Sequence, residues 1–595
     1  MLGWLLSPLQ GKDRMRIHYH IEWDRPNSHY FHITMTIRHP GKRGTVVRIP
    51  AWRPGRYIIQ NYSRNVVNFR AADADGSPLP FHKLDKDSWE IEHGKAGRIL
   101  IHYDYYANEL DGGSSLLNDA EAYINPINLL MYVPGREMLP VTLTLKAPPG
   151  WRIITALEGR PDRGEFQAEN YHELVDNPIL ISPDVRVLSF TAGEARFDLA
   201  FQGEAEPDSQ RVIADVRKIV EAQGRIFGGF PFRRYVFLYH LVPYRFGHGV
   251  EHKNSTSIVL GPADFSDPDF YGNFLGITSH EFFHVWNVER IRPEAIYRPD
   301  YSRENYTGTM WFFEGVTSYY GQLTRFRAGL LSPEAFINRM GGAIRQLQRT
   351  TGRKLTSAYM ASWDSWINSD APPLTGISFY NKGQVLGLLL DLEIRGRTGN
   401  ARSLDNVLRY LYQTYAMKDR GVPEDGIQKA VETVAGSSFE AFFRDYVYGT
   451  REIDYAAFLG RAGLTLQEQI DPSRPEVYVG WHLTGDERET RIQSVEPDSP
   501  AFLAGLDIDD ILLAIDGRRT HVHNVEALLR RYKPGDRITV TVFRRERLRE
   551  FSLELKGGNN RVLMIGFAEN LSPEQLQVLR GWLAQEDSGG AAPGD

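Results

Sequence analysis

The stretch TSHEFFHVWNVERIRP, residues 278–293, contains two histidines four positions apart, His280 and His284, with Glu281 directly after the first. In an α-helix, residues i and i+4 lie on one face a turn apart, so two imidazoles at this spacing can bind one metal ion. Glu281 would lie about 100° around the helix, close enough to take a proton from a metal-bound water. The pattern predicts a zinc site with its base, although two histidines that only share a helix face would give the same five residues.

A zinc site of this kind needs a third protein ligand and leaves its fourth position to water. The segment TMWFFEGVTSYYGQL, residues 309–323, provides Glu314. Prolines and turn residues lie between the two segments, so we expect one helix over 277–289 and another over 309–323. A carboxylate in so apolar a segment is costly unless it is paired or bound to a metal. The alternative is that Glu314 points to solvent or pairs with an arginine.

Composition excludes several classes of site. The chain has no cysteine, so disulfides, thiolate nucleophiles and Cys-ligated zinc are ruled out, and a transition-metal site must use His, Asp or Glu. The net charge of −6 gives no electrostatic reason to expect nucleic acid or an anionic membrane as a partner. No apolar run reaches the roughly 18 residues of a membrane span, and the N-terminus lacks the basic region of a signal peptide. We expect a cytoplasmic protein.

A chain of 595 residues is too long for one core, and its pattern changes along its length. Residues 1–14 look like a disordered lead or a mis-assigned start. Residues 15–205 have the strand-length alternation of a β-sandwich-like domain, and residues 206–462 are mainly helical. Residues 466–556 form a β-rich module. Residues 557–595 contain a Ser-capped amphipathic helix and a tail that we expect to be disordered.

The β-rich module resembles a PDZ domain. IQSVEPDSPAFLAGLDIDDILLAIDG, residues 492–517, has the pattern of a PDZ core, and the Tyr478–Trp481 segment roughly fits the loop that binds a peptide carboxylate. PDZ domains bind a C-terminal peptide at the edge of a sheet, so such a peptide is a candidate partner. The alternative is that the module packs against the rest of the chain and binds no free peptide.

The segments HEFFHVWNVERIRP (280–293) and WFFEGVTSYYG (311–321) resemble the glycyl aminopeptidase family of zinc peptidases, a gluzincin family. Three further segments are similar to that family: IPAWRPGRYIIQNYSRNV (49–66), GHGVEHKNSTS (247–257) and FYNKGQVLGLLLDLEI (379–394). The resemblance implies a multidomain α+β fold. In this fold a thermolysin-like, mainly helical catalytic domain lies between the β-sandwich-like domain and the PDZ-like domain.

The resemblance also implies residue roles. His280, His284 and Glu314 would hold zinc, one ion per chain. Glu281 would be the general base, and Tyr380 would donate a hydrogen bond to the oxyanion. Glu251 would bind the substrate's α-ammonium group, with Gly249 beside the substrate. Without the resemblance, Tyr380 would be a half-buried helix-start aromatic and Glu251 a surface charge. One residue departs from the family pattern: His248 stands where the first glycine of a pair is usual, which weakens the inferred preference for N-terminal glycine or alanine.

These observations favour a zinc-dependent aminopeptidase that hydrolyses the N-terminal peptide bond of peptides with a free N-terminus, with small first residues such as Gly or Ala. One alternative is a zinc endopeptidase of the same fold, in which Glu251 anchors no amine. The other is a PDZ-type binding scaffold with a vestigial metal site. That scaffold would be expected to have a broken zinc or base motif, whereas every element of the motif is intact here.

Overall fold

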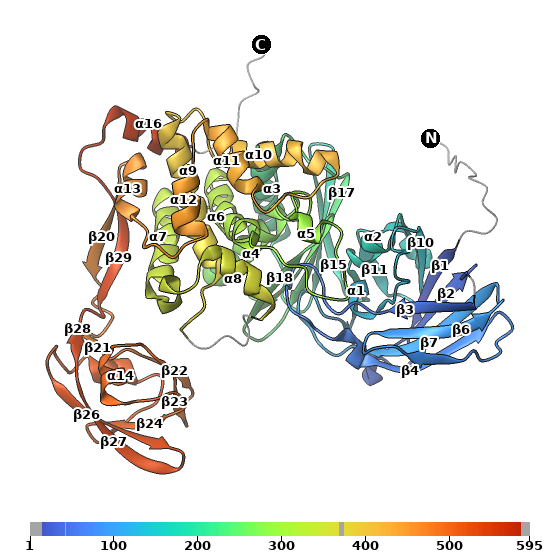
Figure 1. Cartoon of the computed structure of the whole chain (residues 1–595), viewed down its shortest axis with the longest axis horizontal. Helices are drawn as coiled ribbons and strands as arrows, with labels where there is room; N and C mark the ends of the chain where they lie inside the picture. The colour runs from blue at the N-terminus through green and yellow to red at the C-terminus, as the bar shows by residue number, and fades with distance from the viewer. Residues whose placement is uncertain (1–14, 42, 368–373, 585–595) are drawn as a thin grey trace.

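The computed structural model describes residues 15–41, 43–367 and 374–584 of the chain. The lead at 1–14, expected to be disordered or a mis-assigned start, lies outside these residues. The tail after 584, expected to be disordered, also lies outside them. Figure 1 shows a β-rich N-terminal region, a large middle region that combines a sheet with helices, and a small β-rich domain at the opposite end of the molecule. Each region has its own hydrophobic core. The expected multidomain α+β fold is confirmed.

The N-terminal domain is built from alternating strands whose apolar residues face inward, as the burial of every second residue along β2 illustrates. Its short helices are α1 (Pro126–Leu129) and α2 (Tyr171–Val175). Its strands form a seven-stranded sheet in the order β12 (Glu158–Arg160), β13 (Glu165–Ala168), β10 (Val141–Leu145), β1 (Arg16–Glu22), β2 (Tyr30–Arg38), β7 (Arg98–Tyr106), β4 (Val66–Asp73); a four-stranded sheet β11 (Arg152–Thr155), β14 (Ile179–Ser182), β9 (Ala122–Ile124), β8 (Leu116–Leu117); and a three-stranded sheet β3 (Arg43–Arg48), β6 (Ser88–Gly94), β5 (Phe81–Lys83).

The middle region contains a five-stranded mixed sheet in the order β15 (Arg186–Ala192), β16 (Ala195–Gln202), β17 (Arg234–Leu241), β19 (Ser255–Gly261), β18 (Phe246–Glu251). Strand β16 pairs in parallel with β17, so β15 and β16 belong to this sheet. The middle region therefore begins near residue 186, whereas the sequence pattern predicted 206, because strand pairing joins segments that the sequence pattern separates. Strand β18 lies at the edge of the sheet and presents an unpaired side.

The helices of the middle region cover this sheet and surround the core. Helix α4 packs against α3 and α6. Among the described residues, no helix combines the length and the apolar character needed to cross a membrane. The helices are α3 (Ser209–Phe227), α4 (Pro268–Phe283), α5 (Glu294–Tyr297), α6 (Thr317–Arg327), α7 (Pro333–Arg349), α8 (Ala358–Trp363), α9 (Phe379–Arg397), α10 (Leu404–Thr414), α11 (Gly426–Ala435), α12 (Glu440–Phe442) and α13 (Tyr455–Leu459).

Two of the expected helices differ from the structure. The helix expected over 277–289 is the C-terminal part of α4 and ends at Phe283, with turns after it. The helix expected over 309–323 begins as a π-helical turn, Trp311–Val316, and continues as α6. π-helical turns of this kind often occur at functional sites. Glu314 lies in this turn.

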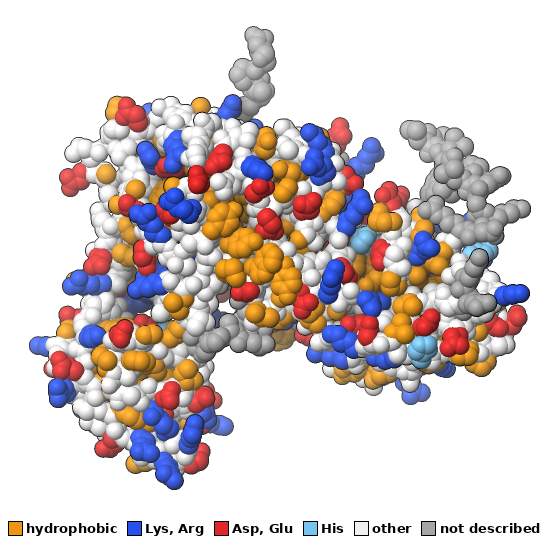
Figure 2. All heavy atoms as spheres, in the orientation of Figure 1, with side chains coloured by type: hydrophobic (Ala, Val, Ile, Leu, Met, Phe, Trp, Pro, Cys, Tyr) orange, Lys and Arg blue, Asp and Glu red, His pale blue; other side chains and the backbone are white. Residues whose placement is uncertain are grey.

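The PDZ-like domain is a small sheet with two short helices. Helices α14 (Pro500–Ala504) and α15 (Val525–Leu529) pack with it, and β22 is an edge strand of the sheet. The strands follow the order β22 (Trp481–Gly485), β23 (Thr490–Val495), β24 (Ile511–Ile515), β26 (Arg537–Arg544), β27 (Arg547–Glu554), with β25 (Arg518–Arg519) on β24 and a separate pair of β21 (Val477–Tyr478) with β28 (Lys556–Gly557). On the face seen in Figure 2, basic and acidic side chains are interspersed over all three regions.

A two-stranded ribbon connects the PDZ-like domain to the middle region. Its strands, β20 (Leu464–Ile470) and β29 (Arg561–Phe567), pair over their full length and flank the domain, which starts near residue 477 rather than 466. The expected C-terminal helix is α16 (Pro573–Trp582), capped by Ser572. Trp582 is fully buried, and its Nε1 donates a hydrogen bond to the Tyr319 hydroxyl at 2.8 Å. The PDZ-like domain is therefore inserted between two segments that both pack on the middle region.

This topology predicts that the inserted domain can be removed without unfolding the rest. Ile470 and Arg561 are directly paired in the ribbon, so an Asn-Gly turn in place of residues 471–560 should close it as a hairpin. We expect the shortened chain to fold and to keep hydrolysis of a single-residue amide, the activity that the resemblance implies, within about twofold, because the deletion removes no candidate site residue. Circular dichroism and a fluorogenic assay measure this, and loss of activity in a folded, metal-loaded deletion would contradict it.

Candidate metal centre

The two histidines of the sequence motif converge at the end of α4. Helix α4 starts at Pro268 behind the cap Asp267, whose side chain accepts a hydrogen bond from a first-turn amide, and it ends at Phe283. The Nε2 atoms of His280 and His284 lie 3.1 Å apart. His284 donates from Nδ1 to the carbonyl oxygen of Asn287 at 2.6 Å, which directs its Nε2 toward His280.

Glu314 completes a three-ligand group. Its Oε2 lies 3.4 Å from Nε2 of His284 and 3.9 Å from Nε2 of His280. The side chain is 2% exposed, and no Lys or Arg of the described residues forms an ion pair with it. The alternatives in which Glu314 points to solvent or pairs with an arginine are therefore wrong.

The arrangement fits a tetrahedral metal ion. Zinc ligands at about 2.0–2.1 Å from the ion lie roughly 3.3 Å from one another, and the three separations between the ligand atoms bracket that value. A second group that could hold a metal combines Glu251 and Glu281 with His284, and the ligand atoms of each group lie within 4.8 Å of one another. We favour the first group, because the second would use the expected base as a ligand and leave His280 out.

Asn287 connects the two segments that carry the ligands. Its side-chain Nδ2 donates to the carbonyl oxygens of Phe312 and Phe313 at 3.2 and 3.3 Å, both in the π-helical turn. Its carbonyl oxygen accepts from His284 Nδ1 and from the Thr317 hydroxyl. This buried network fixes the tautomer of one ligand and the position of the segment that bears another. The sequence reasoning missed Asn287, although it stands only three residues after His284 within the motif.

Glu281 and Glu251 lie beside the three-ligand group. Glu281 is 5% exposed and Glu251 is 7% exposed, and one oxygen of each, Oε2 and Oε1 respectively, has no hydrogen-bond partner among the described residues. Burial, together with the carboxylates of Glu251 and Glu314, raises the pKa of Glu281 to about 8, although His284 opposes the rise. Burial also raises the pKa of Glu314, against the lowering effect of His284. A bound cation would let these buried carboxylates keep their negative charge.

The backbone of the edge strand β18 lies against the side chain of Glu281, the expected base. Gly249 and Glu251 face the same side of β18, since side chains alternate along a strand. A Cβ atom on Gly249 would lie 2.2 Å from Oε1 of Glu281, so only glycine allows this approach. The segment around Glu251 therefore lies at a sheet edge.

His248 points away from this site. It lies on the opposite face of β18 from Gly249, and its Nδ1 accepts a hydrogen bond from the backbone amide of Gly112 at 3.1 Å. Burial lowers the pKa of the imidazole. The imidazole therefore joins the edge strand to the N-terminal domain and does not narrow the space beside Glu281.

Tyr380 stands at the start of α9 over the candidate metal ligands. Ser378 caps this helix, and the ring of Tyr380 lies 6.4 Å from that of His280, centroid to centroid. The side chain is 38% exposed, yet the surrounding protein and the Glu314 carboxylate raise the pKa of its hydroxyl well above the usual 10. Tyr380 therefore remains a protonated hydrogen-bond donor at neutral pH.

Comparison with known proteins gives the same picture. Residues 18–183 match the Peptidase M61 N-terminal domain, residues 273–386 match M61 glycyl aminopeptidase, and residues 477–555 match the PDZ domain. The chain belongs to the M61 glycyl aminopeptidase family. This metallo-aminopeptidase therefore has an M61 N-terminal domain, an M61 catalytic domain and a PDZ domain. The family assignment also argues against a pure PDZ scaffold.

A solved structure resembles this M61 peptidase over most of its length. The aminopeptidase N family protein from Idiomarina loihiensis is 27% identical, with a TM-score of 0.88 over 96% of this chain and 100% of that chain. The M1 zinc metallopeptidase from Deinococcus radiodurans is 14% identical, with a TM-score of 0.46 over 74% of this chain and 95% of that chain. No curated protein matches the sequence.

The N-terminal domain also contributes a turn to the M61 site. The turn that contains Arg53 and Gly55 extends from the N-terminal domain to Glu251, and a Cβ on Gly55 would lie 2.9 Å from Oε2 of that carboxylate. Gly55 also has a φ of +76°, which favours glycine. This turn belongs to the segment at 49–66 that resembles the family, but nothing local to it indicates which other segment it contacts.

We predict that Glu314→Ala loses the metal. The variant removes one of three ligands from a preorganised site, so it should lose tightly bound zinc and activity together. Metal analysis after dialysis measures this. A variant that still holds one full equivalent of tightly bound zinc would rule Glu314 out as a ligand.

We also predict that Gly249→Ala displaces the base while sparing the metal. The added Cβ must push Glu281 from its position, so kcat should fall by roughly a hundredfold or more, the scale of a misplaced catalytic group. Gly247→Ala is the matched control, because a Cβ there, on the same face of β18, meets nothing within 4 Å. Equal activity of the two variants would show that close packing of β18 on Glu281 is not required.

Proposed function

We propose that this M61 peptidase is a zinc-dependent aminopeptidase that removes the first residue of peptides with a free N-terminus. It would carry one Zn²⁺ per chain on His280, His284 and Glu314. The observation that carries the proposal is the position of Glu251. Its carboxylate lies with the Glu281 carboxylate and the His284 imidazole in one group whose ligand atoms are within 4.8 Å of one another.

A carboxylate in this position selects for an exopeptidase. It binds an α-ammonium group through charge-assisted hydrogen bonds, and its unpartnered oxygen is available for that contact. The short separation between Glu251 and Glu281 leaves space for the backbone of one residue between the ammonium group and the scissile bond. A peptide that lies along the unpaired side of β18 would thus present its first peptide bond to the base.

The chain's own residues would perform the proton transfers. Bound zinc would polarise the scissile carbonyl and acidify water. Glu281 would accept a proton from the attacking water and pass it to the leaving amine. Tyr380 would donate a hydrogen bond to the developing oxyanion, and its raised pKa keeps the proton on the hydroxyl until then. Gly249 would let β18, along which the substrate lies, approach the base closely.

The preferred substrates would begin with small residues such as glycine or alanine. The matching catalytic domain is described as a glycyl aminopeptidase, and this supports the preference. His248 no longer argues against it, because its side chain lies on the other face of β18 and contacts Gly112. The cytoplasmic location stays a sequence-based prediction.

The PDZ domain would bind the C-terminal segment of a peptide. Its edge strand β22 has an unpaired side, and the Tyr478–Trp481 segment leads directly into it. Backbone pairing along such an edge, with carboxylate capture at the start of the strand, is the usual PDZ binding mode. The alternative of a purely packing role predicts no affinity for peptides.

The test is Glu251→Gln on substrates with and without a free amine. The change removes one charge-assisted pair in a buried site, worth about 1.5–3 kcal/mol, so kcat/KM on free-amine substrates should fall roughly ten- to a hundredfold. N-acetylated peptides should already be poor substrates for the wild type. Fluorogenic aminoacyl amides and their acetylated counterparts measure both.

The same experiment separates the aminopeptidase from the endopeptidase. If the wild type cleaves an N-acetylated peptide internally as fast as its free-amine counterpart, Glu251 anchors no amine. The proposal would then be replaced by a zinc endopeptidase of the same fold.

A further inference from the structure

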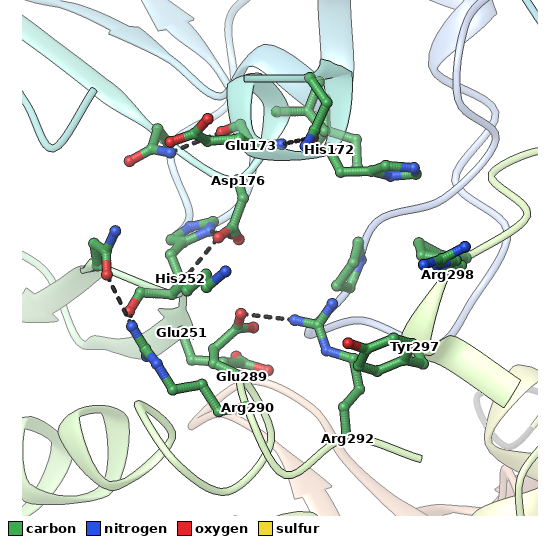
Figure 3. A pocket seen from close by; sticks show the side chains of 18 of the residues that line it. His172, Glu173, Asp176, Glu251, His252, Glu289, Arg290, Arg292, Tyr297 and Arg298 are labelled. Carbon is green, nitrogen blue, oxygen red and sulfur yellow. Dashed lines mark hydrogen bonds and ion pairs between the residues drawn. The ribbon is translucent and has the colours of Figure 1, made fainter. Parts of the chain in front are cut away.

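A second compartment borders the proposed site at Glu251. A cavity of about 460 Å³ lies between the N-terminal domain and the catalytic region, and its lining includes Glu251 but none of His280, Glu281, His284 and Glu314 (Figure 3). Its volume is in the range of roughly 300–1,000 Å³ that is typical of small-molecule sites. Glu251 therefore stands at the boundary between the candidate metal centre and this cavity.

One side of the cavity offers hydrogen-bond acceptors. His252 donates from Nδ1 to Asp176 at 3.1 Å, and the same carboxylate accepts from the backbone amide of Lys253. Nε2 of His252 and Oε1 of Glu251 have no partner among the described residues, and the two side chains are only 6% and 7% exposed. Buried acceptors without partners are costly, so this side fits a cationic donor.

The other side carries two guanidinium groups, each beside a carboxylate. Figure 3 shows Arg292 and Arg298 across the cavity from His252 and Asp176. Arg292 contacts Glu289 through Nη2 at 2.6 Å, which leaves other guanidinium N–H groups available. The nearest carboxylate to Arg298 is that of Asp419, at 3.9 Å, a distance that leaves the guanidinium without a hydrogen bond to it. These two side chains can bind a carboxylate.

We propose that this cavity binds a free α-amino acid, the product that the peptidase itself releases. The inference rests on the proposed function, because Glu251 is there the anchor of the α-ammonium group. A free amino acid is a zwitterion, and its ammonium and carboxylate groups match the two sides of the cavity. Hydrolysis creates the new carboxylate, so only the product carries both groups within one residue.

The shared carboxylate gives the amino acid a route away from the metal ligands. The remaining peptide can leave along the unpaired edge of β18. The amino acid is held at the C-terminal end of this strand, where Glu251 binds its ammonium group. Movement of the ammonium group from one side of this carboxylate to the other would transfer the product to the cavity. A bound amino acid in the cavity then leaves the candidate metal ligands free for the next peptide.

The test measures binding of alanine to the full-length, zinc-loaded protein by equilibrium dialysis. Arg298→Ala removes a side chain that is 70% exposed, so the fold should persist, and alanine binding in the cavity should weaken about two- to fivefold. Ala416→Trp fills the cavity from a lining position remote from the metal ligands and should abolish this binding. Arg303→Ala is the matched control, since Arg303 is 74% exposed and does not line the cavity.

Ethylamine tests the recognition of the carboxylate. It carries the ammonium group alone, so Arg298→Ala should leave its affinity unchanged while weakening that of alanine. The proposal is overturned if alanine binds wild type, Arg298→Ala and Ala416→Trp with the same affinity and stoichiometry, or if ethylamine and alanine lose affinity equally. A failure of the proposed function is distinct, because it would appear as no preference for free-amine peptides, and the dialysis result does not depend on hydrolysis.

Discussion

Repulsion among three buried carboxylates is the constraint on which the rest of the structure depends. Glu251, Glu281 and Glu314 converge on His284 in a site that water barely reaches. Burial favours the neutral imidazole, but the three carboxylates outweigh it and raise the pKa of His284 to about 10. Like charges interact strongly where the dielectric constant is low, so these carboxylates can all stay ionised only with a cation among their oxygens. A divalent metal ion and an ammonium group are both cations, so the same carboxylates can bind either one.

Carboxylates that repel one another stay close together only where the surrounding structure holds them in place. The π-helical turn leaves the carbonyl oxygens of Phe312 and Phe313 free to accept from Asn287. Thr317 adds a hydrogen bond from its hydroxyl to the Asn287 carbonyl oxygen at 3.0 Å. The surrounding segment is apolar and buried, so these polar contacts lie in a densely packed core where rearrangement is costly.

Local features of the sequence predicted the candidate site residues better than they predicted where the helices end. The spacing of His280 and His284 and the apolar surroundings of Glu314 are properties of short segments, and the structure brings these residues together. The end of α4 at Phe283 was missed, because it depends on how the following turns reach the π-helical segment. The contact between Gly55 and Glu251 joins residues 196 positions apart, so no local pattern encodes it. The orientation of His248 likewise follows from the pairing of β18 with β19, which fixes the side of the strand it occupies.

The N-terminal domain is thus part of the specificity of the site. An edge strand alone offers a groove that is open at both ends, which suits an endopeptidase. Here the Gly55 turn packs against Glu251 at the C-terminal end of β18, and Gly112 contacts His248 on its other face. These two contacts hold the end of β18 and the carboxylate that we propose as the anchor of the substrate amine. A catalytic domain without the N-terminal domain would keep its metal ligands but lose the contacts that orient Glu251, and with them the restriction to the first peptide bond.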